Sequence, residues 1–218
     1  MVRRINPPGI EFEQTYWRAG MEWVAGVDEA GRGAWAGPVV AGAVLFPPFG
    51  AIPAPLHEVH DSKLLTPARR ERLFDVIVQM ALGYGVGLVP AGVIDRIGIV
   101  PATRAAMQAA LEALSPAPQA VLIDAVHLPA IDCPQQAIIK GDQKSLSIAA
   151  ASIIAKVSRD RWMRECEARF PGYGFARHKG YGTRQHQAAL DTYGPCAIHR
   201  RSFAPVLQLH LSVESDDE

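Results

Sequence analysis

Residues 26–33, with the sequence GVDEAGRG, lie between two apolar runs, the second of which covers 37–46. The apolar runs predict two neighbouring strands joined by a glycine-rich turn. Asp28 and Glu29 then lie at the end of a buried strand, where a carboxylate without a cationic partner costs several kcal/mol. The glycines around Arg32 let the backbone approach a ligand closely, and its guanidinium suits phosphate or carbonyl oxygens. The stretch indicates either a site for a metal and a phosphate chain or an acidic pair that caps a turn.

The chain of 218 residues fits one ordinary domain, and an apolar content of 49% is enough for a sizeable core. We expect an N-terminal arm with a short helix over 1–20, a main domain over 21–206 and an acidic tail over 207–218. The composition changes near residue 171, after which Gly, Tyr, His and basic residues are frequent. From about residue 171, we therefore expect the main domain to continue as a C-terminal helical extension.

The sequence also bears on the compartment. The three cysteines are widely spaced and odd in number, which favours a reducing compartment and neither a disulfide framework nor a zinc site. The first fourteen residues lack the apolar segment of a signal peptide, so we expect a cytoplasmic protein. Residues 36–56 contain no Asp, Glu, Lys or Arg, but five prolines and three glycines among them argue against a membrane-spanning helix.

Helices and strands are expected to alternate along the chain, which predicts an α/β fold. We expect strands at 23–27, 39–46, 84–89, 120–123 and 136–139. We expect helices at 11–19, 66–81, 91–97, 101–114, 147–170 and 184–193. The boundaries rest on apolar periodicity and on cap residues, such as the Thr-Pro pair at 66–67.

Acidic residues stand at the ends of three of these strands: Asp28 with Glu29, Asp124, and Asp142. Ligands of α/β sheets bind beyond the carboxyl ends of the strands, so we expect these acids to converge. Four converging carboxylates need cations, because mutual repulsion would otherwise raise their pKa values until some were protonated. Since no Cys or His stands at ligand spacing nearby, the metal would be Mg²⁺ or Mn²⁺. Two such ions about 3.5–4 Å apart serve phosphodiester hydrolysis.

The C-terminal third is basic, although the net charge of the chain is zero. Residues 140–201 contain twelve Lys and Arg against five Asp and Glu, which favours a polyanionic ligand. The loop 177–183, with the sequence RHKGYGT, combines basic residues with an aromatic ring, as in proteins that grip a sugar-phosphate chain. Residues 144–147 begin a long helix, so their side chains and amides are expected to face the acids.

Each of these residues also has a structural interpretation. Ser145 is an ordinary helix cap whether or not it contacts phosphate, and Tyr181 is typical of a turn. Lys63 either contacts a phosphate or belongs to a capping turn. The segment 199–202, with the sequence HRRS, is either a phosphate grip or a packing cluster. The remaining acids of interest are expected to be surface residues of a helix and a loop: Asp95 and Asp132.

A series of motifs resembles bacterial ribonuclease HII, in order, from about residue 22 to 206. The motifs are GVDEAGRG at 26–33, AGPVV at 36–40, DSK at 61–63, LID at 122–124, KGDQKS at 140–145, AAASIIAKV at 149–157, YGF at 173–175, HKGYGT at 178–183 and HRRSF at 199–203. Any single motif is only suggestive, whereas the complete ordered series is specific.

This resemblance implies a ribonuclease H-like fold over 21–206, with a mixed five-stranded sheet flanked by helices and a C-terminal helical part that closes over the substrate. It implies cleavage of the RNA strand of RNA–DNA hybrids and incision on the 5′ side of single ribonucleotides in duplex DNA. The implied mechanism uses two Mg²⁺ or Mn²⁺ ions and gives 5′-phosphate and 3′-hydroxyl ends. The implied partner is nucleic acid, and we expect a monomer.

The resemblance also assigns roles to residues of this sequence. The metal-binding and catalytic acids would be Asp28, Glu29, Asp124 and Asp142. The 2′-hydroxyl at the RNA–DNA junction would be recognised mainly by backbone groups of Gly31, Arg32 and Gly33. Tyr181 would stack on the deoxyribose of the next nucleotide. The phosphate contacts would be Lys63, Lys144, Ser145 and Lys179.

The sequence departs from the family pattern at two places. After Gly33 the family usually has Pro-Leu where this chain has Ala34-Trp35, and after Asp124 it often has Gly where this chain has Ala125. Neither change affects the acids, although the first alters the expected wall of the groove.

Three alternatives remain beside this interpretation. A type HIII ribonuclease carries an added N-terminal domain, for which we expect no room before the first strand. A non-catalytic hybrid-binding module would most readily lose one of the four acids, all of which are present. A phosphatase for small esters is less consistent with the basic, tyrosine-bearing C-terminal third.

Overall fold

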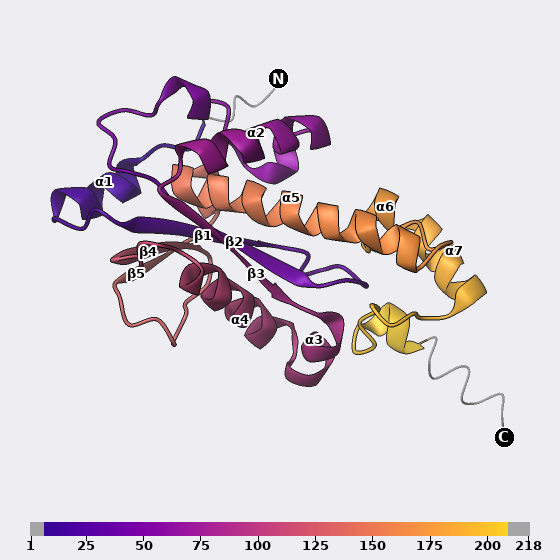
Figure 1. The fold of residues 1–218 in the computed structure, drawn as a ribbon. Helices are drawn as coiled ribbons and strands as arrows, with labels where there is room; N and C mark the ends of the chain where they lie inside the picture. Colours follow the sequence, from indigo (N-terminus) through magenta and orange to yellow (C-terminus); the bar gives the residue numbers. More distant parts are fainter. Residues whose placement is uncertain (1–6, 209–218) are drawn as a thin grey trace.

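Five strands form one mixed sheet in the computed structural model, which describes residues 7–208 (Figure 1). The strands are β1 (Val24–Ala30), β2 (Val39–Leu45), β3 (Gly83–Val89), β4 (Ala120–Asp124) and β5 (Gln135–Ile138). Their order across the sheet is β3-β2-β1-β4-β5. Strands β1, β2 and β3 pair antiparallel, whereas β4 pairs parallel with both β1 and β5. The expected mixed five-stranded sheet is confirmed.

Helices cover both faces of this sheet. They are α1 (Glu11–Arg18), α2 (Pro67–Met80), α3 (Ala91–Ile97), α4 (Ile99–Glu112), α5 (Leu146–Arg169), α6 (Phe175–His178) and α7 (Arg184–Tyr193). Short 3₁₀ helices add Ala54–Leu56, Ser62–Leu64 and Gly141–Gln143. Helices α5 and α2 lie on one face, and α4 lies on the other (Figure 1). Among residues 7–208, no helix is long and apolar enough to cross a membrane.

Several boundaries differ from those expected, most of them by one or two residues, and two of the differences have a clear structural cause. Strand β1 does not end at Val27 but continues through Asp28 and Glu29, because residues 28–30 pair with 40–42 of β2. The acids therefore belong to the strand and not to the turn. Helix α4 begins at Ile99 instead of Pro101, since the chain reverses at Gly98, whose φ is 82°, and the proline lies in the first turn.

Glycines let α5 approach the sheet very closely. A Cβ placed on Gly26 would lie 2.1 Å from the carbonyl carbon of Ser147, and one on Gly42 would lie 2.4 Å from the carbonyl oxygen of Ala151. Any larger residue would displace the helix. Because strand side chains alternate, Asp28 points to the same face as Gly26, toward the side on which α5 packs.

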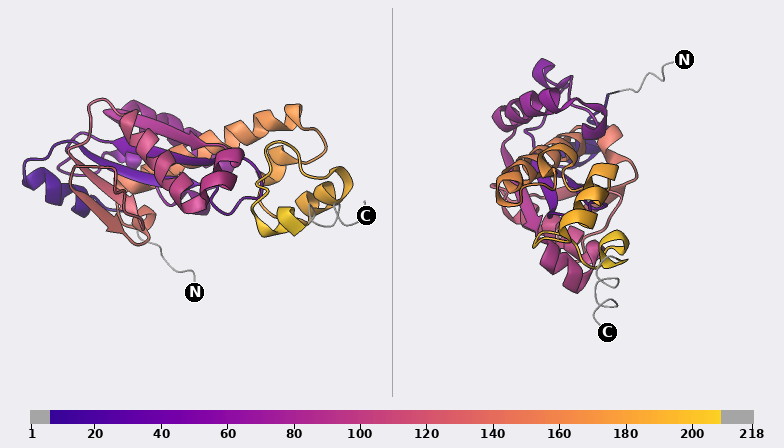
Figure 2. Two further views of the ribbon diagram at one scale, coloured as in Figure 1. Left: turned by 90° about the horizontal axis from the view of Figure 1, so that it is seen from below. Right: turned by 90° about the vertical axis from the view of Figure 1, so that its right-hand side faces the viewer.

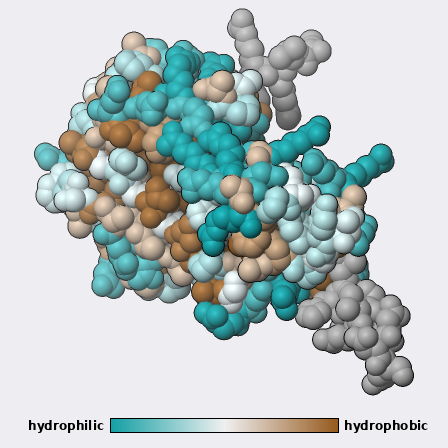
Figure 3. Space-filling view, turned by 45° about the vertical axis from the view of Figure 1, so that its right-hand side comes forward, coloured by the Kyte–Doolittle hydropathy of each residue, from teal (hydrophilic) through white to brown (hydrophobic). Residues whose placement is uncertain are grey.

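The C-terminal segment has a core of its own. Buried residues of the second half of α5 pack with α6, α7 and the last described residues; they include Met163, Cys166, Tyr173, Phe175, Leu190 and Val206. Figure 2 shows this segment extending beyond the end of the sheet. The surface elsewhere is mixed, with hydrophilic side chains over much of the face in Figure 3 and hydrophobic side chains gathered on its left.

Hydrogen bonds connect the N-terminal segment to the start of α5. The carboxylate of Glu13 is buried and its Oε1 accepts hydrogen bonds from Ser145 Oγ, Ser147 Oγ and Ser147 N at 2.6, 2.6 and 2.9 Å. A negative charge is favourable at a helix N-terminus. Gly9 adds two backbone hydrogen bonds to the residues beside it. Residues 1–6 and the acidic tail from 209 lie outside the described part of the chain.

Three histidines form a buried group in the C-terminal core. The Nε2 atoms of His186 and His199 lie 3.0 Å apart, and the ring of His178 stacks on that of His186 with 4.4 Å between centroids. Burial lowers the pKa of His186 to about 4, and burial together with the neighbouring His186 lowers the pKa of His199 to about 4. The cluster is therefore neutral at physiological pH.

We expect this core to lose stability when the pH falls from about 6.5 to 4. The unfolded histidines bind protons near their ordinary pKa of 6.5, whereas folded His186 and His199 stay neutral until about pH 4. Their contribution is thus complete above pH 6.5 and decreases on acidification. Urea unfolding at pH 7 and pH 5 measures the loss, which should be smaller in His199→Gln than in the wild type. The exposed His57→Gln is the control, and equal losses in all three proteins would contradict the prediction.

Candidate active site

Parallel pairing brings Asp28 and Asp124 next to each other. Val27 of β1 is paired with Ile123 of β4. The next residues along the two strands, Asp28 and Asp124, therefore lie at the same level of the sheet. The Oδ1 atom of Asp124 accepts a hydrogen bond from the backbone N–H of Gly141 at 2.8 Å. This bond holds the turn after β5 against the end of β4.

That turn places the third strand-end acid. Lys140 has a left-handed backbone with φ of 56°, and the 3₁₀ turn that follows buries Asp142. A Cβ on Gly141 would lie 2.6 Å from Ile148 Cδ1, so α5 closes the turn from behind. The convergence that the sequence predicted for the strand-end acids therefore follows from register and from one hydrogen bond.

The acids strongly affect one another. Burial, followed by the charges of Glu29, Asp124 and Asp142, raises the pKa of Asp28 well above its ordinary value. Burial also raises the pKa of Glu29, with Arg32 opposing the shift. Burial and the charges of neighbouring acids raise the pKa of Asp142 to about 6. The four carboxylates thus share one desolvated region that disfavours their combined negative charge.

Two cationic side chains reach this region. Lys63 Nζ lies 3.9 Å from Asp142 Oδ2, and Arg32 Nη1 lies 3.4 Å from Glu29 Oε1. Burial lowers the pKa of Lys63, but the surrounding acids, first Asp28 and then Asp142, outweigh it and raise this pKa overall. The acidic cluster therefore attracts positive charge from outside the sheet.

A fifth acid, Asp61, belongs to the same region. It is buried, accepts hydrogen bonds from Lys63 N and Gln143 Nε2 at 2.9 and 3.3 Å, and its charge contributes to the raised pKa of Asp142. In the Asp-Ser-Lys motif, only the lysine was expected to belong to the site. The available sign was an acid two residues before that candidate cation.

The donor set fits a hard divalent cation, because it consists of buried and half-buried carboxylates that repel one another. Within residues 7–208, no three Asp, Glu, His or Cys side chains are already arranged as a metal-binding group. The carboxylates are close enough to affect one another's pKa values but do not all lie at ligand distances from one point. Ligation therefore requires movement of side chains that the backbone already holds near one another.

The Gly-Arg-Gly turn next to the acids rests on a buried arginine. Gly31 has φ of 93°, and a Cβ there would lie 2.0 Å from Arg159 Nε. The fully buried guanidinium of Arg159 donates to the carbonyl oxygens of Pro38, Ala36 and Lys179 at 2.9, 3.0 and 2.9 Å. One side chain thus joins the turn, the segment after it and the basic loop.

Arg200 supports the same turn from the C-terminal segment. Its Nη1 donates to the carbonyl oxygen of Arg32 at 2.7 Å, and its Nε donates to that of Gly37 at 3.0 Å. Both Arg200 and its neighbour His199 are buried. Of the two interpretations of the 199–202 segment, the structure supports packing for these two residues.

Tyr181 lies beside this assembly. Its ring centroid is 5.2 Å from Arg159 Cζ and 5.5 Å from Lys156 Nζ, and the side chain is half-buried. The indole of Trp35 packs against Gly182, where a Cβ would lie only 2.2 Å from Trp35 Cζ2. The backbone N–H of Trp35 also donates to Gly180 O at 2.8 Å. The turn and the tyrosine loop are therefore directly connected.

The expected phosphate contacts lie in different environments. Lys63 and Lys144 are exposed, and Lys179 is half-buried with its Nζ donating to Ala176 O. The expectation that Ser145 contacts a phosphate is not met, because Ser145 is fully buried. Its hydroxyl donates a hydrogen bond to Glu13 and accepts one from Ile148 N at 3.3 Å. Its side chain caps α5 and presents no surface to a phosphate.

The two surface acids also have distinct environments. Asp132 is exposed in a loop. The carboxylate of Asp95 accepts hydrogen bonds from Arg201 N, Ser202 N and Ser202 Oγ at 3.0, 2.9 and 2.6 Å. Asp95 therefore attaches α3 to the C-terminal segment and takes no part in the acidic cluster.

Comparisons with known proteins identify the family. The ribonuclease HII family model matches residues 25–206. A ribonuclease HII of Chloroflexus aurantiacus is 56% identical over 95% of this chain and 98% of its own, and that of Geobacillus thermodenitrificans is 53% identical over 94% and 77%.

Solved structures agree with this match. The ribonuclease H2 of Pyrococcus horikoshii superposes with a TM-score of 0.73 at 28% identity, covering 88% of this chain and 99% of its own. The ribonuclease HII of Archaeoglobus fulgidus, solved as a complex with PCNA, gives 0.68 at 26%, covering 85% and 96%. A Bst ribonuclease HIII with Mn²⁺ shares the fold, with a TM-score of 0.64 at 19% identity over 88% and 70%. The chain therefore belongs to the ribonuclease HII family of endonucleases.

Proposed function

We propose that this protein cleaves the RNA strand of RNA–DNA hybrids and incises on the 5′ side of single ribonucleotides in duplex DNA. The observation that carries the proposal is the cluster of four carboxylates, of which Asp28 and Asp142 are buried and Glu29 and Asp124 half-buried, beside a turn supported by two buried arginines. Residues 21–206 form the catalytic unit, which acts as a cytoplasmic monomer on nucleic acid.

The four acids would hold two divalent ions, Mg²⁺ or Mn²⁺, and Lys63 lies at the rim of their site. Such a pair would supply activation of the attacking water and neutralisation of charge on the leaving oxygen, and the products would carry 5′-phosphate and 3′-hydroxyl ends. The acids themselves are acceptors fixed by the strand ends, with Asp124 oriented by Gly141 N. The Bst ribonuclease HIII described with Mn²⁺ supports this choice of ion by analogy of fold.

The Gly-Arg-Gly turn recognises the substrate. Backbone groups of Gly31, Arg32 and Gly33 contact the 2′-hydroxyl, which is the group that distinguishes RNA from DNA. Arg200 orients the carbonyl of Arg32, because it donates to that oxygen. Tyr181 stacks on the deoxyribose of the following nucleotide. The exposed Lys63 and Lys144, together with Lys179, contact phosphates.

The wild-type protein should cut a DNA duplex with one ribonucleotide in Mg²⁺ or Mn²⁺. Asp28→Asn and Asp124→Asn should each lower the rate by about 10³-fold, because stabilisation of charge at the reacting phosphate is usually the largest catalytic contribution. Gel analysis of end-labelled duplex measures the rate and the 5′ position of the cut. Asp132→Asn, in an exposed loop, is the matched control and should cut like the wild type. No cleavage by the wild type with either ion would refute the proposal.

Removing a carboxylate should stabilise the metal-free protein. Because the pKa of Asp142 is raised to about 6, its charged form costs stability above that pH. We expect Asp142→Asn to melt about 3 °C higher than the wild type in EDTA at pH 8, as about 1 kcal/mol produces in a domain of this size. Added Mg²⁺ should raise the melting temperature of the wild type more than that of the variant. A variant that melts lower in EDTA would contradict the electrostatic account.

Tyr181 should contribute to recognition more than to folding. Tyr181→Ala should slow incision at a single ribonucleotide by about tenfold, the low end of what loss of an aromatic stacking contact costs. Tyr181→Phe keeps the ring and should retain most of the activity. Incision rates are compared with melting temperatures of both variants. If the alanine variant lost stability and activity in proportion, the ring would have a structural role only.

A further inference from the structure

A cleft lies between α2, α5 and the segment of α6 and the loop after it, and none of the strand-end acids lines it. Its volume is about 250 Å³, and Tyr181 is part of its lining. The basic side chains that line it are Arg70, Lys156, Arg164, Arg177 and Lys179. These residues come from segments far apart in the sequence, so the cleft is a product of the tertiary fold.

The acids in this cleft are already shared between cations. Asp160 pairs with Lys156 at 2.7 Å and with Arg70 at 3.7 Å. Glu71 pairs with both Arg164 and Arg161. The cleft therefore has more positive charge than its own acids neutralise.

The excess of positive charge in the cleft affects the pKa of Lys179. Burial lowers the pKa of its ammonium group, Asp160 opposes the shift, and the charges of Arg164, Lys156 and Arg70 lower it further. Arg70 is itself buried, and its guanidinium is fixed by the carbonyl oxygens of Ser62 and Leu65 at 2.8 and 2.6 Å. Because the guanidinium of Arg70 is already ordered, it is available to an anion bound in the cleft at little ordering cost.

The cleft is built on the loop that presents Tyr181. Arg159 holds the carbonyl oxygen of Lys179, and Lys156 lies 5.5 Å from the tyrosine ring. An anion in the cleft would therefore be a close neighbour of whatever stacks on Tyr181. In a nucleic acid, the neighbour of a stacked sugar is a backbone phosphate.

We propose that this cleft binds a backbone phosphate of the DNA on the 3′ side of the ribonucleotide. The proposal rests on the proposed function, in which Tyr181 contacts the first deoxyribose after the ribonucleotide. The cleft extends recognition from the junction into the following DNA and requires that DNA to continue past Tyr181. It does not read sequence, because phosphate contacts position a substrate without reading its bases.

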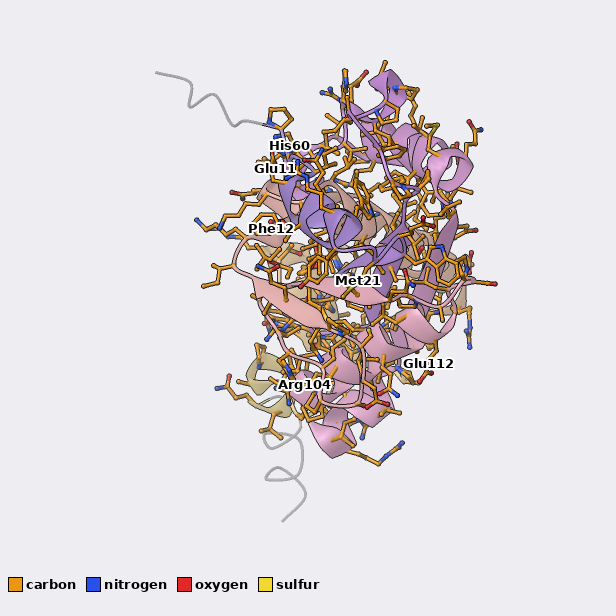
Figure 4. All side chains as sticks on the ribbon, turned by 90° about the vertical axis from the view of Figure 1, so that its left-hand side faces the viewer. Glu11, Phe12, Met21, His60, Arg104 and Glu112 are labelled. Atoms are coloured by element: carbon orange, nitrogen blue, oxygen red, sulfur yellow. The ribbon has the colours of Figure 1, made fainter. Side chains whose placement is uncertain are left out.

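The test compares two duplexes that differ only on the 3′ side of the ribonucleotide. In one the DNA continues for a full helical turn, and in the other it stops at the first deoxynucleotide. Binding is measured by fluorescence anisotropy in EDTA, so that it does not depend on cleavage. The variants are Lys156→Gln combined with Arg177→Gln, and Arg177→Glu alone in case the double variant is unstable. Arg104→Gln is the control, because Arg104 is exposed on α4 on the other side of the sheet (Figure 4).

On the long duplex, we expect both cleft variants to bind about tenfold more weakly than the wild type and Arg104→Gln. The slope of log affinity against log salt should fall by about 1, as for the loss of one phosphate contact. On the short duplex, all four proteins should bind alike. Equal weakening on both duplexes, or none on the long one, would overturn the proposal.

Two further outcomes separate the possible failures. If inorganic phosphate raised the melting temperature of the wild type but not of the variants, while the two duplexes still behaved alike, the cleft would hold a free anion and the proposal would be wrong. A wild type that cut neither duplex in Mg²⁺ or Mn²⁺ would refute the proposed function. The binding difference between the duplexes would still decide the question of the cleft.

Discussion

The close contact between α5 and the glycines of β1 and β2 determines where the functional groups lie. Gly26 and Gly42 leave no room for a side chain, so the first half of α5 packs directly on the strand backbone beside Asp28. The same helix is 24 residues long, about 36 Å at 1.5 Å per residue, and its second half carries Arg159 beneath Gly31. The carboxylates and the supported turn are thus fixed by one rigid element, and a shift of α5 would disturb both.

The fold buries groups of both charges near the end of β1. Buried carboxylates raise one another's pKa values there, as at Asp28 and Asp142. Arg159 and Arg200, which contact the turn after β1, are fully buried, and burial with the nearby Arg159 lowers the pKa of Arg200 to about 9. Either arrangement alone costs free energy. The arginines recover part of this cost through hydrogen bonds to backbone carbonyls, whereas Lys63 and Arg32 offset part of the repulsion between the acids.

Much of this arrangement was predictable from the sequence, because strand patterns and strand-end acids are local signals. The acids converge as predicted, since parallel register alone aligns Asp28 with Asp124. The role of Arg159 was not predicted, because a basic residue in an amphipathic helix resembles the solvated residues around it. Glu13 carried no local sign either, since its partner Ser147 lies 134 residues away. Contacts of this kind depend on tertiary packing, which periodicity does not encode.

Trp35 connects the Gly-Arg-Gly turn to the C-terminal core. Its ring lies 5.4 Å from that of His186, whose Nδ1 is 3.1 Å from the carbonyl oxygen of Tyr181. Trp35 is therefore in contact with His186, and His186 must stay neutral to remain buried. A charge on His186 would act directly on Trp35 and on the Tyr181 loop, because both contact its ring. The stability of the C-terminal core thus bears on the geometry of the Gly-Arg-Gly turn, even though none of its histidines lies among the strand-end acids.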